Sequence, residues 1–310
     1  TSPPHLLSPA APKTPPGAPP VPINTSIPEP SVAVEITPET NSWLDDTEIV
    51  LTHRRVDKVK LSEIYVTPDI EIEDERSDII NIENSQQILS EPNFYLISGE
   101  EQQGKTSLLK YLFREFSKKS YLPLYIDASD VKKSDLSKTL ENAITQQYIN
   151  LTTEQLISYE DSIIFIDNID NIKLNNKHTE KFIKQVQETF KHVVLTCHSS
   201  FDLVSSEITY LDSYLVCRLL GLGNLKREVI AKKWIALGVE ESIEEKELYS
   251  ECDELKARLN TAIKKNIVPP KPVYVLMLIQ MFEAYAKQSI ELTSYGHCYQ
   301  QLVYQSLEQA

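Results

Sequence analysis

The chain has 310 residues, and 41% of them are hydrophobic, so it can bury a sizeable core and form two or three domains. Its formal net charge of −14 excludes a protein that is basic throughout, and no stretch gives a direct nucleic-acid-binding signal. No apolar run approaches the ~18–20 residues of a membrane span, and no signal peptide is present. We therefore expect no membrane partner. The four cysteines form no CxxC pair, which predicts a chain of the reducing cytoplasm with no zinc site or disulfide framework.

Residues 1–40 are predicted to be a disordered, Pro-rich linker, because they hold 12 of the 18 prolines and no aromatic residue. The stretch Pro15–Pro20 (PPGAPP) could instead be a ligand for an SH3-like domain, although Pro-rich linkers are commoner. The chain begins at Thr1 rather than Met and ends inside a helical pattern, so we expect it to be a segment of a longer protein.

Residues 41–90 are predicted to be a lead-in segment with short strands. The apolar stretches at Glu48–Thr52 and Ile64–Thr67 resemble strands. A short helix is expected at Ser85–Leu89, and it should end before Pro92.

The stretch FYLISGEEQQGKTSLLKYL, from Phe94 to Leu112, reads as a buried strand, a loop and an amphipathic helix. Its spacing Gly-x-x-x-x-Gly-Lys-Thr fits a phosphate-binding P-loop, and two of only 7 glycines in the chain stand at the required positions. The glycines let backbone N–H groups converge on an anion, and the helix that follows adds the positive end of its dipole. The alternative is an ordinary strand–turn–helix that happens to contain Gly-Lys. The residues expected to bind nucleotide here are Gly99, Glu100, Glu101, Gln102, Gln103, Gly104, Lys105, Thr106 and Ser107.

Residues 91–220 are predicted to be a P-loop NTPase core, because strands and helices alternate along them. Strands are expected at Phe94–Ser98, Leu122–Ile126, Ser162–Ile166, Val193–Cys197 and Tyr214–Leu219. Helices are expected from Lys105 onward, at Asp135–Tyr148 and around Phe182–Phe190, where apolar residues recur at helical spacing. This alternation predicts an α/β fold in which a parallel sheet lies between two helical layers.

The second half of the nucleotide site is predicted where Ser162-Ile-Ile-Phe-Ile-Asp167 ends. A carboxylate at the carboxyl end of a buried strand next to the P-loop strand can hold Mg²⁺ through water. We therefore place Thr106 and Asp167 on the metal side, and expect Lys105, Asp167 and Asp170 to be catalytic. Asp170 could orient or activate the attacking water, or it could cap a helix.

Further polar residues are weaker candidates. Thr196 and His198, near the end of the strand that follows, could sense the γ-phosphate or could cap the next helix. Arg218 could stabilise charge, but a solvent-exposed arginine is the more probable reading. The same preference for a solvated surface position applies to Arg54 and Arg55, which could otherwise contact nucleotide.

Residues 221–310 are predicted to be an all-helical domain, truncated at its end. The expected helices are Asn224–Leu237, with an Asn cap and Gly238 after its end, Glu240–Lys265, Val273–Gln288 and Cys298–Gln309. A Pro-rich break, Ile267–Pro272, separates the second helix from the third.

With these motifs in place, residues 45–310 resemble the STAND class of P-loop NTPases, which contains the NACHT and NB-ARC modules and many bacterial anti-phage proteins. GEEQQGKTSLLKYL resembles their Walker A motif, and IIFIDNID resembles their Walker B motif. IVPPKP before VYVLMLIQ resembles the motif whose proline lies near the nucleotide base; position favours Pro272 for this role over Pro270. THRRVDK and CHSS depart from the motifs that NB-ARC proteins have at these places.

The resemblance implies a nucleotide-dependent switch in a multidomain signalling or immune protein. ATP or ADP with Mg²⁺ would bind between the core and the helical domain, and ATP binding would favour an open state that self-associates. Slow hydrolysis would reset it, and effector and sensor domains would lie outside this segment. One alternative is an AAA+-like motor ATPase, for which only Arg218 and Arg227 are candidate arginine fingers. Another is a nucleotide-binding scaffold with little turnover, which the intact Lys105, Thr106 and Asp167 argue against.

Overall fold

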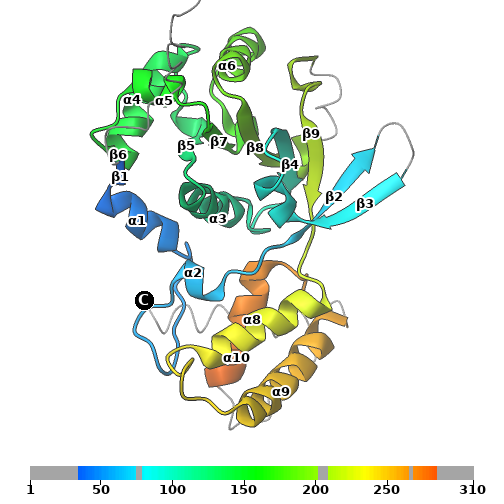
Figure 1. The fold of residues 1–310 in the computed structure, drawn as a ribbon. Helices are drawn as coiled ribbons and strands as arrows, with labels where there is room; N and C mark the ends of the chain where they lie inside the picture. Colours follow the sequence, from blue (N-terminus) through cyan, green and yellow to red (C-terminus); the bar gives the residue numbers. More distant parts are fainter. Residues whose placement is uncertain (1–33, 75–78, 202–208, 265–267, 285–310) are drawn as a thin grey trace, which may run out of the picture. The chain divides into compact units, whose positions relative to one another are not determined.

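The computed structural model describes residues 34–74, 79–201, 209–264 and 268–284. Its central element is a seven-stranded sheet in the order β3-β2-β9-β4-β8-β7-β5 (Figure 1). The strands are β2 (Asp69–Asp74), β3 (Ile79–Asn84), β4 (Phe94–Gly99), β5 (Leu122–Asp127), β7 (Ser162–Asp167), β8 (His192–His198) and β9 (Leu215–Leu219).

The sheet is mostly parallel. The five neighbouring strands β9, β4, β8, β7 and β5 all run in one direction. The prediction of an α/β P-loop core on a parallel sheet is therefore confirmed. The strands β2 and β3, which were not predicted, form an antiparallel pair; β2 also pairs antiparallel with β9 and so extends the sheet on that side.

The order of the strands corrects one prediction. The strand ending at Asp167 was predicted to lie next to the P-loop strand, but β8 lies between β4 and β7. Because the three strands are parallel, their carboxyl ends still meet at one edge of the sheet. A side chain at the end of β7 can therefore reach the loop after β4 across the intervening strand.

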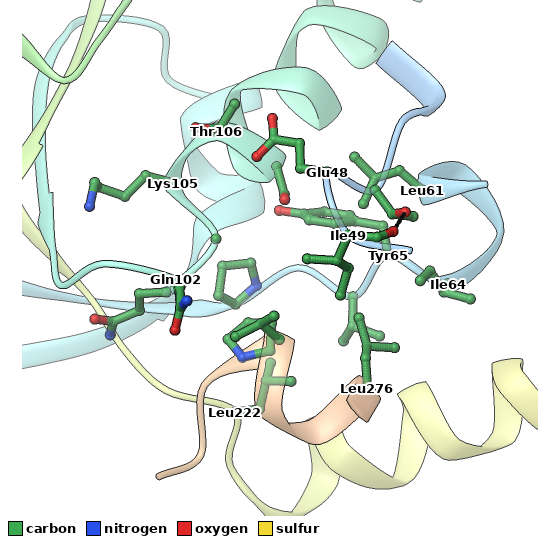
Figure 2. A pocket seen from close by; sticks show the side chains of 18 of the residues that line it. Glu48, Ile49, Leu61, Ile64, Tyr65, Gln102, Lys105, Thr106, Leu222 and Leu276 are labelled. Atoms are coloured by element: carbon green, nitrogen blue, oxygen red, sulfur yellow. Dashed lines mark hydrogen bonds between the residues drawn. The ribbon is translucent and has the colours of Figure 1, made fainter. Parts of the chain in front are cut away.

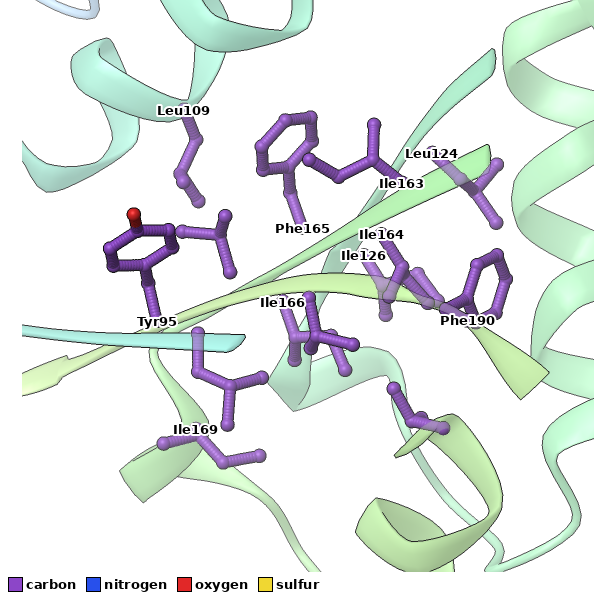
Figure 3. Close-up of a cluster of buried hydrophobic side chains, with 14 of the residues drawn as sticks. Tyr95, Leu109, Leu124, Ile126, Ile163, Ile164, Phe165, Ile166, Ile169 and Phe190 are labelled. Atoms are coloured by element: carbon purple, nitrogen blue, oxygen red, sulfur yellow. The ribbon is translucent and has the colours of Figure 1, made fainter. Parts of the chain in front are cut away.

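Helices cover both faces of the sheet. The apolar stripe of α3 is buried, and the Phe165 ring on β7 lies 6.4 Å from the Phe113 ring and 6.2 Å from the Phe116 ring. Because side chains alternate along a strand, the neighbouring Ile164 points to the opposite face, toward Phe190 at the end of α6 (Figure 3). The helices of this part are α3 (Lys105–Lys118), α4 (Leu136–Gln147), α5 (Thr153–Ser158) and α6 (Asn176–Thr189).

The start of the described chain is ordered. β1 (Glu35–Ile36) pairs antiparallel with β6 (Tyr148–Ile149), and α1 (Pro38–Asp45) follows with Thr37 as its cap and Pro at its first position. The prediction that residues 1–40 are disordered is therefore wrong for residues 34–40. Residues 1–33 lie outside the described part of the chain.

The lead-in segment does not form the two strands predicted for it. Residues 48–52 are irregular, because Glu48 has a φ of 62°, which no strand accommodates. The second stretch is split between the end of α2 (Leu61–Ile64) and irregular backbone. Instead of pairing, Leu51 and Val59 are buried in a second core with the helices that follow β9. The short helix predicted at Ser85–Leu89 is present as a 3₁₀ turn.

The helices after β9 are α8 (Asn224–Ala236), α9 (Glu245–Lys264) and α10 (Pro272–Ala284). They share an apolar core that is distinct from the core around the sheet, and all described residues belong to one unit, Val34–Ala310. The cap prediction for α8 is wrong: Gly223 is the N-cap, and Asn224 is the first helical residue. Gly238 does follow the end of this helix, with a φ of 75°. The predicted helix Cys298–Gln309 lies outside the described residues.

None of the helices within the described ranges has both the length and the apolar character needed to cross a bilayer.

The helical core contains a buried histidine that predicts a pH dependence of stability. The His53 side chain is fully buried, edge-on to the Trp234 ring at 5.1 Å between centroids, and its Nε2 lies 3.7 Å from a Glu283 carboxylate oxygen. Burial lowers the pKa of His53; Glu283 opposes this effect, and Arg55 and Arg54 add to it.

A lowered folded-state pKa means that the unfolded chain takes up the proton more readily. The contribution of neutral His53 to the free energy of unfolding is complete above the pKa of a histidine in the unfolded chain, about 6.5. It is lost as the pH falls through the lower pKa of His53 in the folded chain. We expect the free energy of unfolding, measured in urea, to fall between about pH 7 and about pH 5, and to fall less steeply in His53→Gln. The exposed His178 provides the control His178→Gln, which should keep the wild-type slope. An unchanged slope in His53→Gln would contradict the prediction.

Candidate nucleotide site

The loop between β4 and α3 has the backbone conformation that an anion-binding loop requires. Gly104 has a φ of 92°, in the left-handed region that favours glycine, and it is the N-cap of α3. Gly99, at the end of β4, lies so close to β9 that an added Cβ would be 3.3 Å from Leu219 Cβ. Steric constraints therefore favour glycine over any other residue at both positions of the motif. The N-terminus of α3 points its free N–H groups at the space in front of the loop.

Lys105 is buried at the start of α3, with 8% of its surface exposed. Its Nζ donates hydrogen bonds to the carbonyl oxygens of Gly99, at 2.7 Å, and Glu100, at 3.0 Å. Burial lowers the pKa of this ammonium, whereas the carboxylates of Asp167 and Asp170 raise it. The loop therefore holds a desolvated ammonium beside the anion site, where exchange of carbonyl oxygens for phosphate oxygens would satisfy the same donors.

Asp167 is the focus of a buried hydroxyl network. Only 1% of its surface is exposed, and its carboxylate accepts hydrogen bonds from Thr106 Oγ1 at 2.6 Å, from the Tyr125 hydroxyl at 3.1 Å, and from Thr196 Oγ1. The two predicted metal-side residues are thus in direct contact. Their oxygen atoms are the donor type that Mg²⁺ prefers. The described residues contain no cluster of three or more His, Cys, Asp or Glu side chains that could form a complete metal cage.

The other predicted polar residues lie at the same edge of the sheet. The Asp170 carboxylate accepts a hydrogen bond from the His198 backbone N–H at 3.0 Å, and the His198 ring lies 2.8 Å from the Ser200 hydroxyl. His198 is in register with Gly99 on the neighbouring strand. Asp170 and His198, like Asp167, do not line the cavity described next, and their predicted roles stay predictions. Thr196 Oγ1 donates to Asp167 and accepts a hydrogen bond from the Asn168 N–H, so it helps to fix the Asp167 carboxylate.

A cavity of about 440 Å³ opens in front of the loop. Figure 2 shows Lys105 and Thr106 at one end and the aliphatic side chains of Ile64 and Leu276 at the other. Three parts of the chain line it: residues 101–107 of the loop and α3, the lead-in segment, and the helical part. The lining residues outside the loop are Thr47, Glu48, Ile49, Leu61, Ile64, Tyr65, Val66, Pro68, Asn168, Leu222, Ile230, Pro272, Val273 and Leu276.

The gradient from a polar to an apolar end suits a nucleotide. Backbone N–H groups, an ammonium and a hydroxyl face the end where phosphates would bind, and a flat apolar base would fit between the aliphatic walls. Pro272 lies in the wall, and an added Cβ on Gly104 would be 3.6 Å from its Cγ. Pro270 does not line the cavity; its carbonyl accepts a hydrogen bond from the Leu222 N–H at 2.7 Å.

The sequence analysis did not predict the lead-in residues of this cavity. Glu48 forms an ion pair at 2.9 Å with Lys110, whose side chain is fully buried on α3 and lies 4.8 Å from the Trp43 ring centroid. Tyr65 stacks on Tyr111, and burial raises its pKa well above the usual value. The sequence does contain one signal for such a contact: Lys110 stands among the apolar positions of the P-loop helix, and a buried lysine there requires an acidic partner.

The arginine candidates lie away from the cavity. Arg54 pairs with Glu251 at 2.8 Å and Glu283 at 3.1 Å, and Arg55 donates to the Ile235 carbonyl. Arg218 forms an ion pair with Glu71 at 2.8 Å. Arg227 is buried and donates to the Leu222 carbonyl and to two asparagine side chains, so it is a structural residue of the helical part. A role for Arg227 as an exposed arginine finger is therefore ruled out in this conformation.

The conformation of Gly104 predicts the effect of a substitution. An L-residue at a φ of 92° costs about 1–2 kcal/mol, whereas the added Cβ would make only ordinary contact with Pro272. We expect Gly104→Ala to lower the free energy of unfolding by about 1 kcal/mol in urea titrations. Gly223→Ala is the matched control, because Gly223 has a φ of −64° and no heavy atom within 4 Å of an added Cβ. Equal losses in the two variants would contradict the prediction.

Comparison with known proteins agrees with this geometry. Residues 91–222 match the sequence profile of a family described as "AAA domain". No curated protein sequence gives a significant match.

Solved structures that superpose on the chain do so weakly. The RuvB Holliday junction branch migration motor of Thermotoga maritima has 13% identity and a TM-score of 0.35, covering 65% of each chain. Domain III of the T. maritima replication initiation protein DnaA has 16% identity and a TM-score of 0.38, covering 70% of this chain and 88% of that one. AMPPCP-bound DnaA from Aquifex aeolicus has 14% identity and a TM-score of 0.35, covering 70% and 72%. TM-scores of this size do not support any inference about function. Residues 91–222 are thus similar in sequence to the AAA domain, and the loop between β4 and α3 within them has the geometry of a P-loop.

Proposed function

We propose that this chain binds ATP and ADP with Mg²⁺ and hydrolyses ATP slowly, as the switch module of a larger signalling protein. The observation that carries the proposal is the composition of the cavity wall. Phosphate-loop residues such as Lys105 line the cavity together with Leu222, Pro272 and Leu276 of the helical part. A nucleotide bound there would touch both parts, so its phosphate state could bias how they pack.

The residues present fit a magnesium ion. The Thr106 hydroxyl and the Asp167 carboxylate, 2.6 Å apart, would hold it between them directly or through water. When bound, the ion would neutralise charge on the β- and γ-phosphates. Asp167 keeps its orientation through Tyr125 and Thr196, and Lys105 supplies the second positive charge. Asp170, next to the end of β8, remains our candidate for orienting the attacking water.

The finer part of the proposal is a STAND-type immune switch. The pattern of Walker motifs followed by a helical part, with Pro272 in the cavity wall, supports it. In this proposal the ATP state favours self-association, and effector and sensor domains outside residues 1–310 supply the activity and the trigger. Defence against phage is the role that the resemblance to bacterial STAND proteins suggests.

A motor ATPase of the AAA+ kind is the second candidate, and the match of residues 91–222 to the AAA domain favours it. A motor requires fast turnover and an arginine reaching into the site of a neighbouring subunit. Arg218 is the remaining candidate for that role, and it is engaged with Glu71 within its own sheet. This engagement supports the slow switch over the motor.

The test is the nucleotide content and turnover of the purified chain. We expect released nucleotide to be ADP or ATP, tight binding of Mg·ATP in preference to Mg·GTP, and slow hydrolysis that EDTA abolishes. Rapid exchange with fast turnover would favour the motor. Absence of any adenine nucleotide binding would overturn the proposal and leave a scaffold with a degenerate site.

A further inference from the structure

The phosphate loop contains two carboxylates, which is unfavourable for a loop that closes around a polyphosphate. Glu100 and Glu101 both lie between Gly99 and Gly104, and both are exposed. Carboxylates a few ångströms from bound phosphates repel them through solvent that screens only partly at this range. The loop therefore needs positive charge beyond that of Lys105.

That charge comes from the helical part. Lys271 Nζ lies 2.8 Å from Glu100 Oε2 and donates a second hydrogen bond to the Glu101 carbonyl at 3.1 Å. The hydrogen bond and the charge of Lys271 lower the pKa of Glu100, which keeps the carboxylate ionised and paired. One side chain from outside the AAA domain thus contacts both acidic residues of the loop.

The two lysines hold the same stretch of loop from different sides. Lys105 donates to the carbonyls of Gly99 and Glu100, whereas Lys271 contacts the Glu100 carboxylate and the Glu101 carbonyl. When phosphate draws the Lys105 ammonium away from the carbonyls, Lys271 is the cation that remains to hold residues 99–101.

The backbone around Lys271 is fixed, so its ammonium is delivered to a defined place. The Lys271 carbonyl accepts the first helical hydrogen bond of α10, from the Val275 N–H at 3.1 Å, and the Lys271 N–H donates to the Pro269 carbonyl at 2.8 Å. The Leu222 N–H donates to the Pro270 carbonyl at 2.7 Å, which ties this turn to the segment after β9. Only 20% of the Lys271 side chain is exposed, compared with 59% for Glu100.

We propose that Lys271 is a positioning residue for nucleotide binding: it neutralises Glu100 and holds the outer side of the phosphate loop while the helical part is docked. The inference rests on the proposed nucleotide binding. It adds that affinity for nucleotide depends on contact between Lys271 and the loop, so movement of the helical part changes affinity without any change in the AAA domain itself.

The experiment is a double-mutant cycle on affinity for Mg·ATP and Mg·ADP, measured by calorimetry on the full chain. We expect Lys271→Met to weaken Mg·ATP binding by about 5–10-fold, because the phosphate loop then carries an uncompensated Glu100 carboxylate that repels the polyphosphate. Lys271→Met with Glu100→Gln should return to within about twofold of wild type, and Lys271→Arg should retain affinity. The loss in Lys271→Met should shrink between about 0.05 M and about 0.5 M salt, because salt screens the repulsion.

Lys226→Met is the matched control. Lys226 pairs with Asp69 at 3.2 Å and so also joins the helical part to the sheet, but its partner stands on β2 and not in the phosphate loop. Its affinity should equal that of wild type. Glu100→Gln alone tests the pair from the loop side should Lys271→Met fail to fold, and it should bind at least as tightly as wild type.

Two results overturn the inference. One is a Lys271→Met affinity within twofold of wild type, and the other is a double variant as weak as Lys271→Met, which would mean a purely structural role. If wild type binds nucleotide and Lys105→Ala does not, either result removes the role of Lys271 and leaves the proposed function standing. If wild type binds no nucleotide, both fall together.

Discussion

Lys105→Ala is expected to lower the affinity for Mg·ATP by about 100-fold or more. The ammonium is buried at the mouth of the cavity, and its two hydrogen bonds, at 2.7 and 3.0 Å, go to carbonyl oxygens that phosphate oxygens can replace. Each charge-assisted hydrogen bond contributes about 1.5–3 kcal/mol, so two of them correspond to at least two orders of magnitude in affinity.

The same substitution should barely change the stability of the empty protein. Burial lowers the pKa of Lys105, because desolvation disfavours the charged form, and this cost offsets the two hydrogen bonds to carbonyl oxygens in the empty protein. We expect a change in the free energy of unfolding of less than about 1 kcal/mol in urea, alongside the loss of binding in calorimetry. This contrast separates a functional lysine from a structural one.

The control is Lys118→Ala. Lys118 ends the same helix, and its side chain is 69% exposed and paired with Glu115, so it should bind Mg·ATP as wild type does. If Lys105→Ala binds Mg·ATP within about threefold of wild type, then the loop is not the phosphate site, and the cavity has another occupant.

The features that could be predicted from the sequence are those set by neighbouring residues: the spacing of a motif, a run of apolar residues or a helical period. The loop from Gly99 to Gly104 follows from spacing that backbone sterics require at those two positions, and the strand ending at Asp167 is recognisable from its continuous apolar run. The apolar stripe of α3 follows from its period. In the structure these elements bring Lys105, Thr106 and Asp167 together at one edge of the sheet, as their motifs predicted.

Features that depend on contacts between distant segments could not be predicted. Nothing local says that β8 is inserted between β4 and β7, or that β2 and β3 extend the sheet beside β9. Glu48 is an example at the site: its sequence surroundings favour a strand, but its partner Lys110 lies 62 positions away along the chain, and its φ of 62° breaks the pattern. Tertiary contacts override strand propensity there.

Asp167→Asn is expected to reduce the rate of ATP hydrolysis by about 100-fold or more while leaving nucleotide affinity within about tenfold of wild type. The substitution removes the negative charge that faces the metal side of the site but keeps the shape of the side chain. The hydroxyls of Thr106, Tyr125 and Thr196 all donate to Asp167, and because hydroxyls can also accept, they can reorient around the new amide. Stability should therefore fall by only about 1 kcal/mol.

Asp127→Asn is the matched control, because it removes a carboxylate from the same edge of the sheet but outside the proposed metal site. Asp127 ends β5 in register with Asp167 at the end of β7, so it is a carboxylate at the same edge of the sheet on the next strand. Whereas Asp167 accepts a hydrogen bond from Thr106 of the phosphate loop, Asp127 accepts one from the Ser129 N–H at 2.8 Å, as the cap of a short turn. Asp127→Asn should hydrolyse ATP at the wild-type rate, measured as phosphate release at saturating Mg·ATP. If both variants lose activity equally, the edge of the sheet matters only for folding; if neither does, Asp167 is not on the metal side. If only Asp167→Asn loses ATP hydrolysis, then Asp167 is the carboxylate that acts with Thr106 on the metal side of the site.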